Sequence, residues 1–354
     1  MKTINVAIAS DESYLPGAIG ALASVRIALE ESFDLNVIFL HDGLSEASQE
    51  KCRLSVQKIS GSTNFEFVKI DQDFSRFPRF PGATQLTYAR LLLPDFTKCP
   101  RLLYLDADIM VLKSIAPLFE MEIHDSGVAG VIEPGIRTIG ADFQLGCPFS
   151  VNLEAPYFNA GFLVLDMIKI KKNGLFDRAF SILNQYPEFC KIWDQSPLNY
   201  VVNGCFTVLD SDHNFQNSRY YQSPVGFINP LKNRSMNIHF IAPKCKPWQK
   251  YSAHPADTMF RMLLDEIYPE WRTREFNESE LKTRLRMSFA HFHPFLFRAR
   301  AMLKRMLGKD FSSDLWAARN WQVFSDDLRE SKKRIRELEH LYAGWQSQIR
   351  SRLV

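Results

Sequence analysis

The stretch Arg101-Leu102-Leu103-Tyr104-Leu105-Asp106-Ala107-Asp108-Ile109-Met110-Val111-Leu112 decides the fold of this chain. Its apolar run at 102–105 predicts a buried strand. Asp106 and Asp108 follow at i and i+2, so both carboxylates should project to one side where the strand ends. Two such oxygen donors suit a hard divalent cation, Mg²⁺ or Mn²⁺, which in turn can hold a phosphate. In the alternative interpretation, one aspartate caps the following turn and the other is simply exposed.

Strand and helix patterns alternate in the residues before this stretch. Apolar segments at 4–9, 35–40 and 65–70 predict strands, residues 16–31 predict a buried helix, and Ser45 fits the N-cap of another helix. This alternation is typical of an α/β protein with a largely parallel sheet. Ligands of such sheets bind at the carboxyl ends of the strands.

The composition predicts a folded protein without a disulfide framework. Of the 354 residues, 46% are hydrophobic, enough for a sizeable core. The six cysteines include no Cys-x-x-Cys pair, so reduced thiols in a cytoplasm are the simplest interpretation. The first residues do not resemble a signal peptide, and no apolar window is long enough to span a membrane.

Basic residues concentrate near the carboxyl end. The net charge is only +3, yet residues 281–309 carry eight Lys or Arg and no acid, interleaved with aromatic side chains. This pattern predicts a segment, placed at 276–310, that lies on an anionic membrane surface. Nucleic acid is the competing partner for a basic patch, and no nucleic acid is predicted here.

Residues 311–354 show a seven-residue repeat. Apolar side chains recur every seven residues, with a second set three residues further on: Trp321, Leu328, Ile335, Tyr342 and Ile349, then Phe324, Leu338 and Trp345. One interpretation is a short coiled coil that forms a homodimer. The other is an amphipathic helix that folds back onto its own domain.

Polar residues accompany several predicted strands beyond the first three. Arg90 lies in a predicted helix that ends at Pro94, just before the acidic strand. Glu133 ends an apolar strand at 127–133, and the irregular segment 134–156 has the length of a binding loop or lid. Asn159 precedes a strand at 162–165, and the small residues at 160 and 161 allow another group to approach the backbone closely.

Two further motifs lie later in the chain. Asp194 and Gln195 stand before a predicted helix whose N-cap would be Ser196 and whose end would be Gly204. His239 lies in a short apolar strand at 237–241, and a loop with Lys244 and Lys246 follows it, a natural place to hold a diphosphate.

In series, these motifs resemble glycosyltransferase family 8, the retaining transferases with the GT-A fold. The resemblance covers about residues 4–248 and rests on six motifs: the 9–14 turn, Thr87-Tyr88-Ala89-Arg90-Leu91, Leu103-Tyr104-Leu105-Asp106-Ala107-Asp108, Phe158-Asn159-Ala160-Gly161, Asp194-Gln195 and His239 with Lys246-Pro247-Trp248. It implies a Rossmann-like, mixed and largely parallel sheet flanked by helices. The GT-A domain would span 1–275, followed by an α-helical carboxyl-terminal extension.

The resemblance also implies roles for individual residues. Asp106, Asp108 and His239 would bind Mn²⁺ or Mg²⁺. Lys246 would contact the diphosphate of a UDP-hexose donor, and Asp106 would also face the nucleotide. The uridine would be held by Asp11, Ser13 and Tyr14. The residues facing the donor sugar would be Arg90, Asn159, Asp194 and Glu133, with Gln195 beneath the anomeric carbon.

The function implied is metal-dependent, retaining transfer of galactose or glucose to a saccharide or glycolipid acceptor, such as lipopolysaccharide, at the inner face of the cytoplasmic membrane. Two departures from the family pattern stand out: Ser196 replaces an aspartate, and the segment from His239 to Lys246 is one residue longer and lacks a glycine.

Alternatives from other classes of protein are a non-catalytic sugar-nucleotide-binding or scaffold protein and a phosphotransferase with an Asp-x-Asp motif.

Overall fold

The computed structural model describes residues 2–79, 84–143, 149–216, 225–241, 246–249, 255–272, 293–307, 314, 322 and 334–354. The chain divides into two compact units. The first contains Met1–Phe215, Met236–His239 and Arg352–Val354, and the second contains Gln216–Ser235 and Phe240–Ser351. The predicted boundaries at 275 and 310 fall outside the described residues, so they stay predictions.

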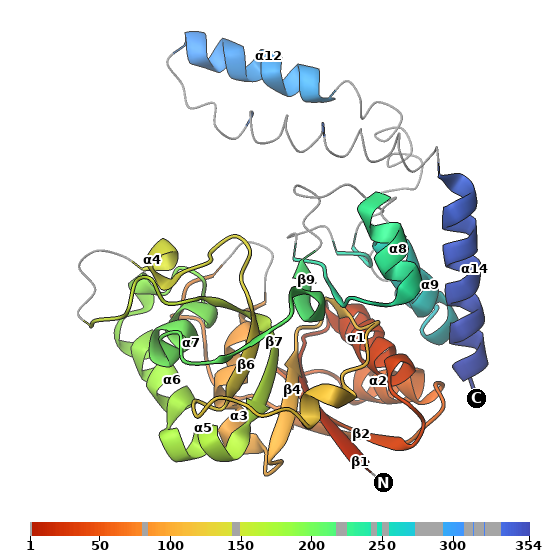
Figure 1. The fold of residues 1–354 in the computed structure, drawn as a ribbon, viewed down its shortest axis with the longest axis horizontal. Coiled ribbons are helices and arrows are strands. Elements are labelled where there is room, and N and C mark those ends of the chain that lie inside the picture. The colour runs from red at the N-terminus through yellow and green to blue at the C-terminus, as the bar shows by residue number, and fades with distance from the viewer. Residues whose placement is uncertain are drawn as a thin grey trace. The chain divides into compact units, whose positions relative to one another are not determined.

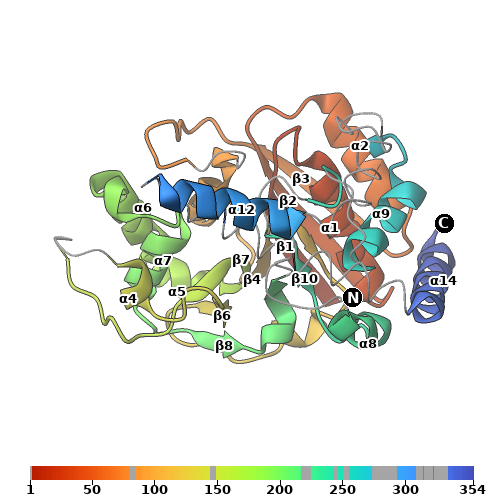
Figure 2. The same cartoon turned by 90° about the horizontal axis from the view of Figure 1, so that it is seen from above.

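A seven-stranded sheet forms the centre of the first unit, in the order β3-β2-β1-β4-β7-β6-β8. The strands are β1 (Lys2–Ala9), β2 (Phe33–His41), β3 (Thr63–Lys69), β4 (Arg101–Leu105), β6 (Val128–Ile132), β7 (Phe158–Asp166) and β8 (Thr207–Leu209). Figure 1 shows the red β1 and β2 on one side of β4 and the later β6 and β7 on the other, and Figure 2 shows the same sheet from above.

Strand β7 makes this sheet mixed. It runs antiparallel to both β4 and β6, whereas the pairs β1–β2, β2–β3, β1–β4 and β6–β8 are parallel. The mixed, largely parallel α/β sheet predicted from the sequence is therefore confirmed.

The helices of the first unit are α1 (Leu15–Ala28), α2 (Glu46–Gln57), α3 (Leu93–Phe96), α4 (Ile139–Asp142), α5 (Met167–Asn173), α6 (Leu175–Gln185) and α7 (Gln195–Val202). Short 3₁₀ helices are η1 (Gln85–Leu92), η2 (Ala116–Phe119), η3 (Pro187–Phe189) and η4 (Ser211–Asn214). Helix α1 is buried from Leu15 to Ile27, as its nearly continuous apolar sequence predicts. Ser45 caps α2 by accepting a hydrogen bond from the Ser48 N–H, as predicted.

A second, three-stranded sheet has the order β5-β10-β9, with β5 at Ile109–Met110, β10 at Ile238–His239 and β9 at Phe215–Gln216. Strand β10 pairs antiparallel with β5, and His239 lies opposite Ile109. The buried Asn237 fixes this pairing, because its Oδ1 accepts hydrogen bonds from the Leu112 and Lys113 N–H groups at 3.0 and 2.9 Å. The pairing brings a residue from late in the chain next to the aspartates that follow β4.

Three local predictions were wrong. Strand β7 begins at Phe158 and not at residue 162, so Asn159 lies inside the strand and not before it. Pro94 does not end a helix: it occupies the first turn of α3, which follows the 3₁₀ helix η1, and proline is well tolerated at that position. Helix α7 begins at Gln195 with Asp194 at the N-cap, and it ends before Asn203, which adopts the left-handed conformation. Ser196 is therefore inside the helix, where its Oγ accepts a hydrogen bond from the Ile192 N–H at 2.8 Å.

The second unit contains α8 (Val225–Asn233), α9 (Pro255–Ile267), α12 (His293–Met306) and most of α14 (Ile335–Arg352). On α14 the buried residues are Leu341, Trp345 and Ile349, and the Trp345 Nε1 donates to the Met259 carbonyl of α9 at 2.9 Å. The same chain therefore covers these apolar side chains, which favours the folded-back helix over the coiled coil. Trp321, Phe324 and Leu328 lie outside the described residues.

In the part of the chain that is described, none of the helices combines the length and apolar character needed to cross a bilayer.

Candidate active site

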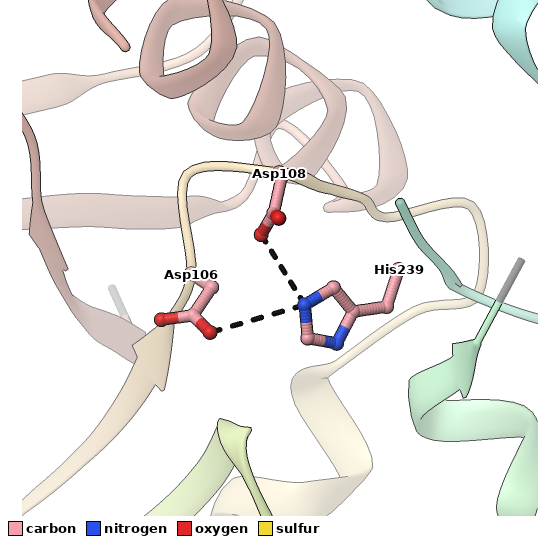
Figure 3. Close-up of side chains that lie close together, drawn as sticks. All are labelled: Asp106, Asp108 and His239. Carbon is pink, nitrogen blue, oxygen red and sulfur yellow. Dashed lines mark ion pairs between the residues drawn. The ribbon is translucent and has the colours of Figure 1, made fainter. Parts of the chain in front are cut away.

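Asp106, Asp108 and His239 meet at the end of β4 (Figure 3). The His239 Nε2 lies 3.2 Å from the Asp108 Oδ1 and 3.8 Å from the Asp106 Oδ2, so both carboxylates point toward the same imidazole nitrogen. One ligand atom from each of the three residues lies within 4.8 Å of the other two. Three donors of these types at this separation suit a divalent ion such as Mn²⁺.

The strands explain why these residues meet. Asp106 is the first residue after β4, and its N–H donates to the Gly161 carbonyl of the neighbouring β7 at 2.8 Å. Asp108 directly precedes β5, which pairs with β10 and so carries His239 to the same place. Asp108 and His239 are 8% and 4% exposed. The predicted metal ligands are therefore brought together from segments about 130 residues apart by backbone pairing.

Gly161 leaves room for the neighbouring side chains of His239 and Asp106. A Cβ atom at this position would lie 2.5 Å from the His239 Cε1 and 2.6 Å from the Asp106 Oδ2, closer than side chains can pack. The close approach predicted for the small residues at 160 and 161 is thus made by two of the predicted metal ligands.

Arg90 contacts this group as a buried cation. Its Nη2 donates to the Asp106 Oδ1 at 2.8 Å, its Nε lies 2.8 Å from the Asp194 Oδ2, and its Nη1 donates to the Ala160 carbonyl. Its guanidinium carbon is 4.3 Å from the centre of the Tyr104 ring. Burial alone would lower the pKa of Arg90, but the carboxylates of Asp106 and Asp194 raise it above its ordinary value. Arg90 is therefore a charged part of the site, not a surface residue.

Asp194 is 2% exposed, and its Oδ1 accepts a hydrogen bond from the Thr87 Oγ at 2.5 Å. Burial raises the pKa of Asp194 to about 6; Arg90 and Thr87 act in the opposite direction, and Asp106 adds to the increase. A carboxyl group with such a pKa is typical of functional sites.

The remaining residues predicted to face the donor sugar form a connected set beside the aspartates. The Asn159 Nδ2 donates to the Glu133 Oε2 at 2.7 Å, and the Asn159 Oδ1 accepts from the Gly161 N–H at 2.9 Å. Gln195 is 7% exposed, and its Oε1 accepts from the Ala160 N–H at 2.8 Å. Backbone groups of two neighbouring β7 residues, Ala160 and Gly161, thus hold Asn159, Gln195 and Arg90 in place.

The electrostatics of this group fit a bound cation. The group contains the buried guanidinium of Arg90 and four carboxylates, those of Asp106, Asp108, Asp194 and Glu133. Closely spaced carboxylates repel each other unless positive charge lies between them. A divalent ion held by Asp106, Asp108 and His239 would supply that charge, and the residues present therefore fit one.

The predicted uridine-binding residues lie in the turn between β1 and α1. The Asp11 Oδ1 accepts hydrogen bonds from the Ser13 and Tyr14 N–H groups, both at 2.9 Å, and from the Ser13 Oγ at 2.8 Å. Asp11 therefore orders this turn, while Ser13 is exposed and Tyr14 is half-buried. Their contact with a nucleotide stays a prediction.

Lys246 belongs to the second unit. It is 4% exposed, and its Nζ donates to the Phe240 carbonyl at 2.6 Å. Lys244 lies outside the described residues, so the contact of a lysine with a diphosphate stays a prediction.

Two residues of the site were missing from the sequence prediction. Thr87 forms hydrogen bonds with both Arg90 and Asp194. Asn214 links His239 to Asn159: its Nδ2 donates to the Asn159 Oδ1, and its Oδ1 lies 2.9 Å from the His239 Nδ1. Thr87 stands three residues before Arg90 in a quoted motif, so its spacing on a helix was an available signal. No pattern marks Asn214, which lies at the end of η4.

Comparison with known proteins decides the family of this site. Residues 5–252 match the model of glycosyl transferase family 8. The chain belongs to this family. Membership confirms the resemblance inferred from the six motifs and makes the protein a glycosyltransferase, which contradicts the phosphotransferase hypothesis.

Several relatives of this family 8 glycosyltransferase are known. It is 28% identical to the lipopolysaccharide glucosyltransferase WaaO of Escherichia coli over 304 residues, covering 81% of this chain and 85% of that protein. It is also 28% identical to the lipopolysaccharide 1,3-galactosyltransferase of Salmonella typhimurium over 266 residues, covering 72% and 76% of the two chains.

The same fold occurs in a solved structure. The crystal structure of the galactosyltransferase LgtC, in complex with donor and acceptor sugar analogs, matches with a TM-score of 0.60 and 25% identity, covering 76% of this chain and 99% of LgtC. The GT-A fold predicted from the sequence is therefore confirmed.

Proposed function

We propose that this glycosyltransferase moves galactose or glucose from a UDP-hexose to a saccharide of lipopolysaccharide or another lipid-linked glycan, with retention of configuration and with a divalent metal. The observation that carries the proposal is the convergence of Asp106, Asp108 and His239 beside the buried pair of Arg90 and Asp194. The names of the two lipopolysaccharide transferases support the class of acceptor.

The chemistry explains the need for such a site. Cleavage of the bond between the anomeric carbon and UDP leaves a multiply charged diphosphate. A divalent ion bound by Asp106, Asp108 and His239 would stabilise that charge as it develops. Arg90 holds the Asp106 carboxylate in one orientation through the bond to its Oδ1, which leaves the Oδ2 facing His239. Lys246 is proposed to contact the diphosphate.

Gln195, Asn159 and Asp194 are proposed to orient the donor sugar. The Oε1 of Gln195 is fixed by the Ala160 N–H, and an uncharged amide oxygen is a weak nucleophile, unlike the carboxylate of a retaining glycosidase. We therefore propose that the acceptor hydroxyl attacks the anomeric carbon on the face from which UDP leaves. The new carbon–oxygen bond forms as the bond to the β-phosphate breaks, and the hydroxyl proton passes to the departing phosphate oxygen.

The proposed place of action is the inner face of the cytoplasmic membrane. Helix α12 supports this location, because it exposes both apolar and basic side chains. Phe295, Met302 and Met306 are 71%, 67% and 76% exposed, and Arg298 and Arg305 are exposed as well. A helix with these properties can bind at an anionic lipid surface.

The test is a donor assay with purified protein, Mn²⁺ and either UDP-galactose or UDP-glucose, with and without lipopolysaccharide as acceptor. We expect slow hydrolysis of one donor, faster turnover with acceptor, and loss of both when the metal is chelated. Asp108→Asn should reduce turnover by about 100-fold or more, because a ligand of the charge-stabilising ion is lost.

A matched control is Asp125→Asn, since the Asp125 side chain is 98% exposed. This variant should keep full activity. Absence of both donor hydrolysis and metal-dependent UDP binding would contradict the proposal. Binding of UDP-hexose without turnover on any acceptor extract would instead favour a non-catalytic sugar-nucleotide-binding protein.

A further inference from the structure

His239 is connected through two asparagines to groups whose hydrogen-bonding roles are fixed. The His239 Nδ1 lies 2.9 Å from the Asn214 Oδ1, and the Asn214 Nδ2 donates to the Asn159 Oδ1 at 2.7 Å. Asn159 then bonds the Gly161 N–H and the Glu133 carboxylate. A backbone N–H can only donate and an ionised carboxylate can only accept, so both groups beyond Asn159 have one possible role.

These roles determine which atom each amide presents. Asn159 must direct its oxygen to the Gly161 N–H and its nitrogen to Glu133. Asn214 therefore meets an oxygen of Asn159, and it must present its own nitrogen there. The remaining amide atom of Asn214, its oxygen, faces the imidazole of His239 and can only accept. The imidazole must then carry its proton on Nδ1.

The consequence lies on the other side of the ring. A neutral imidazole with its proton on Nδ1 has a lone pair on Nε2, the nitrogen 3.2 Å from the Asp108 Oδ1. That lone pair is what binds a metal. Histidine ligands commonly donate their second N–H to an acceptor that fixes the tautomer and the ring orientation.

We propose that Asn214 is a positioning residue of the metal site, which holds His239 in the Nδ1–H tautomer and aims its Nε2 at the ion. The inference rests on the proposed metal site. The chain of bonds starts at the β7 backbone, so the strand that bonds the Asp106 N–H through Gly161 also sets the tautomer of the third ligand.

Burial restricts the orientation of the two amides and the tautomer of His239. Asn214, His239 and Asn159 are 2%, 4% and 8% exposed, so solvent cannot readily replace a lost partner. An amide rotated by 180° would place two oxygens, or two N–H groups, against each other in a setting where unpaired polar groups are costly. The tautomer is therefore coupled to the packing of three side chains.

The test compares Asn214→Leu, which removes both bonds, with Asn214→Asp, which still accepts from the Nδ1–H. The first measurement is the ¹⁵N NMR spectrum of the imidazoles in metal-free protein at about pH 9, where an ordinary imidazole is neutral. The protein has eight histidines, and His239→Gln assigns the signal. We expect the Nδ1–H tautomer in the wild type and in Asn214→Asp, and its loss in Asn214→Leu.

The second measurement is calorimetric titration of the metal-free protein with Mn²⁺ alone. Asn214→Leu should weaken binding by about 10 to 100-fold, the usual effect of removing an outer partner of a ligand. Asn5→Leu is the control: Asn5 is also buried, but its Nδ2 donates to the Arg101 carbonyl, and Mn²⁺ affinity should not change.

The outcomes separate this inference from the proposed function. If the wild type does not bind Mn²⁺, the metal part of the proposed function fails, while the NMR result still tests the tautomer. An unchanged tautomer and Mn²⁺ affinity in Asn214→Leu would overturn the role of Asn214. The same is true if Asn214→Asp loses the Nδ1–H tautomer while it remains folded.

Discussion

Asp194 carries its negative charge almost without solvent, with Arg90 as its ion-pair partner and Thr87 as its hydrogen-bond donor. Burial raises its pKa from an ordinary value of 3.8 to about 6. The folded protein therefore binds a proton at this group more tightly than the unfolded chain does. The stability that this group contributes is fully present below about pH 4 and is lost as pH rises through about 6.

This linkage predicts a pH-dependent difference between the wild type and Asp194→Asn in metal-free protein. The asparagine does not ionise, so the free energy of unfolding of the variant, relative to the wild type, should increase between about pH 4 and 6. The increase should reach about 3 kcal/mol, the equivalent of the shift in pKa. Urea unfolding at a series of pH values measures it. A difference that stays constant over this range would contradict the raised pKa.

At the scale of single residues, sequence patterns predicted most residues of the candidate active site but not the hydrogen bonds that connect them. Asp106, Asp108 and His239 stand in recognisable motifs, and the structure brings them together. Asn214 could not be predicted, because its role depends on contacts with Asn159 and His239, which are 55 and 25 residues away. A polar residue at the end of a 3₁₀ helix has no local feature that reveals such partners.

Among the elements, the strands were predicted better than the helix ends. Runs of buried apolar residues identify β1, β2 and β4 directly, because each crosses the core of the sheet. For α7 the local signals, Ser196 followed by Pro197, predict a start two residues too late. Asp194 and Gln195 are held by Arg90 and by the Ala160 N–H from other elements, so tertiary contacts fix the first residues of the helix.

Helix α12 leads to a prediction about membranes. Two of its bases, Arg300 and Lys304, pair with Asp314 at 3.3 and 2.5 Å, whereas Arg298 and Arg305 are exposed bases outside those pairs. Each exposed base near an anionic lipid surface contributes about 1 kcal/mol. The double variant Arg298→Glu/Arg305→Glu should therefore lower binding to vesicles with anionic lipid by at least tenfold, as measured by cosedimentation, and added salt should weaken wild-type binding.

Lys51→Glu/Lys172→Glu is the control for this experiment, since it makes the same charge change at exposed lysines on α2 and α5. It should bind vesicles as the wild type does. Equal wild-type binding to neutral and anionic vesicles would argue against the electrostatic part of the interaction, and the apolar side chains of α12 would then account for it.

On the scale of the whole molecule, the first unit is assembled from three separate parts of the sequence. Met236–His239 brings the third predicted metal ligand, and Arg352–Val354 brings the end of the chain. Local periodicity cannot predict that either segment belongs to the first unit, because both depend on pairing with residues far away in the chain. The family resemblance predicted the role of His239, while nothing in the sequence predicted where residues 352–354 lie.

The last three residues lead to a prediction about stability. Leu353 forms an antiparallel bridge with Ile59, the Val354 N–H donates to the Lys58 carbonyl at 2.8 Å, and the Arg352 carbonyl accepts from the Ser60 N–H at 2.7 Å. The Arg352 guanidinium also donates to backbone carbonyls at the end of α1, those of Arg26, Ile27 and Leu29. These carbonyls belong to the last turn of a buried helix and the residue after it, where the helix itself supplies no N–H partner. The Leu29 carbonyl also accepts from the Arg26 Nη2 at 3.3 Å.

Deletion of residues 352–354 should therefore lower the free energy of unfolding by about 2 to 4 kcal/mol, since it removes several hydrogen bonds to partly buried carbonyls. Arg352→Lys should lose about half of that amount, because an ammonium lacks the planar fork that reaches several carbonyls at once. Urea unfolding followed by tryptophan fluorescence measures both. Arg350→Lys is the control, since its exposed side chain pairs with Glu266 and the change should stay within about 0.5 kcal/mol. A deletion variant as stable as this control would show that the chain end does not hold the last turn of α1 in place.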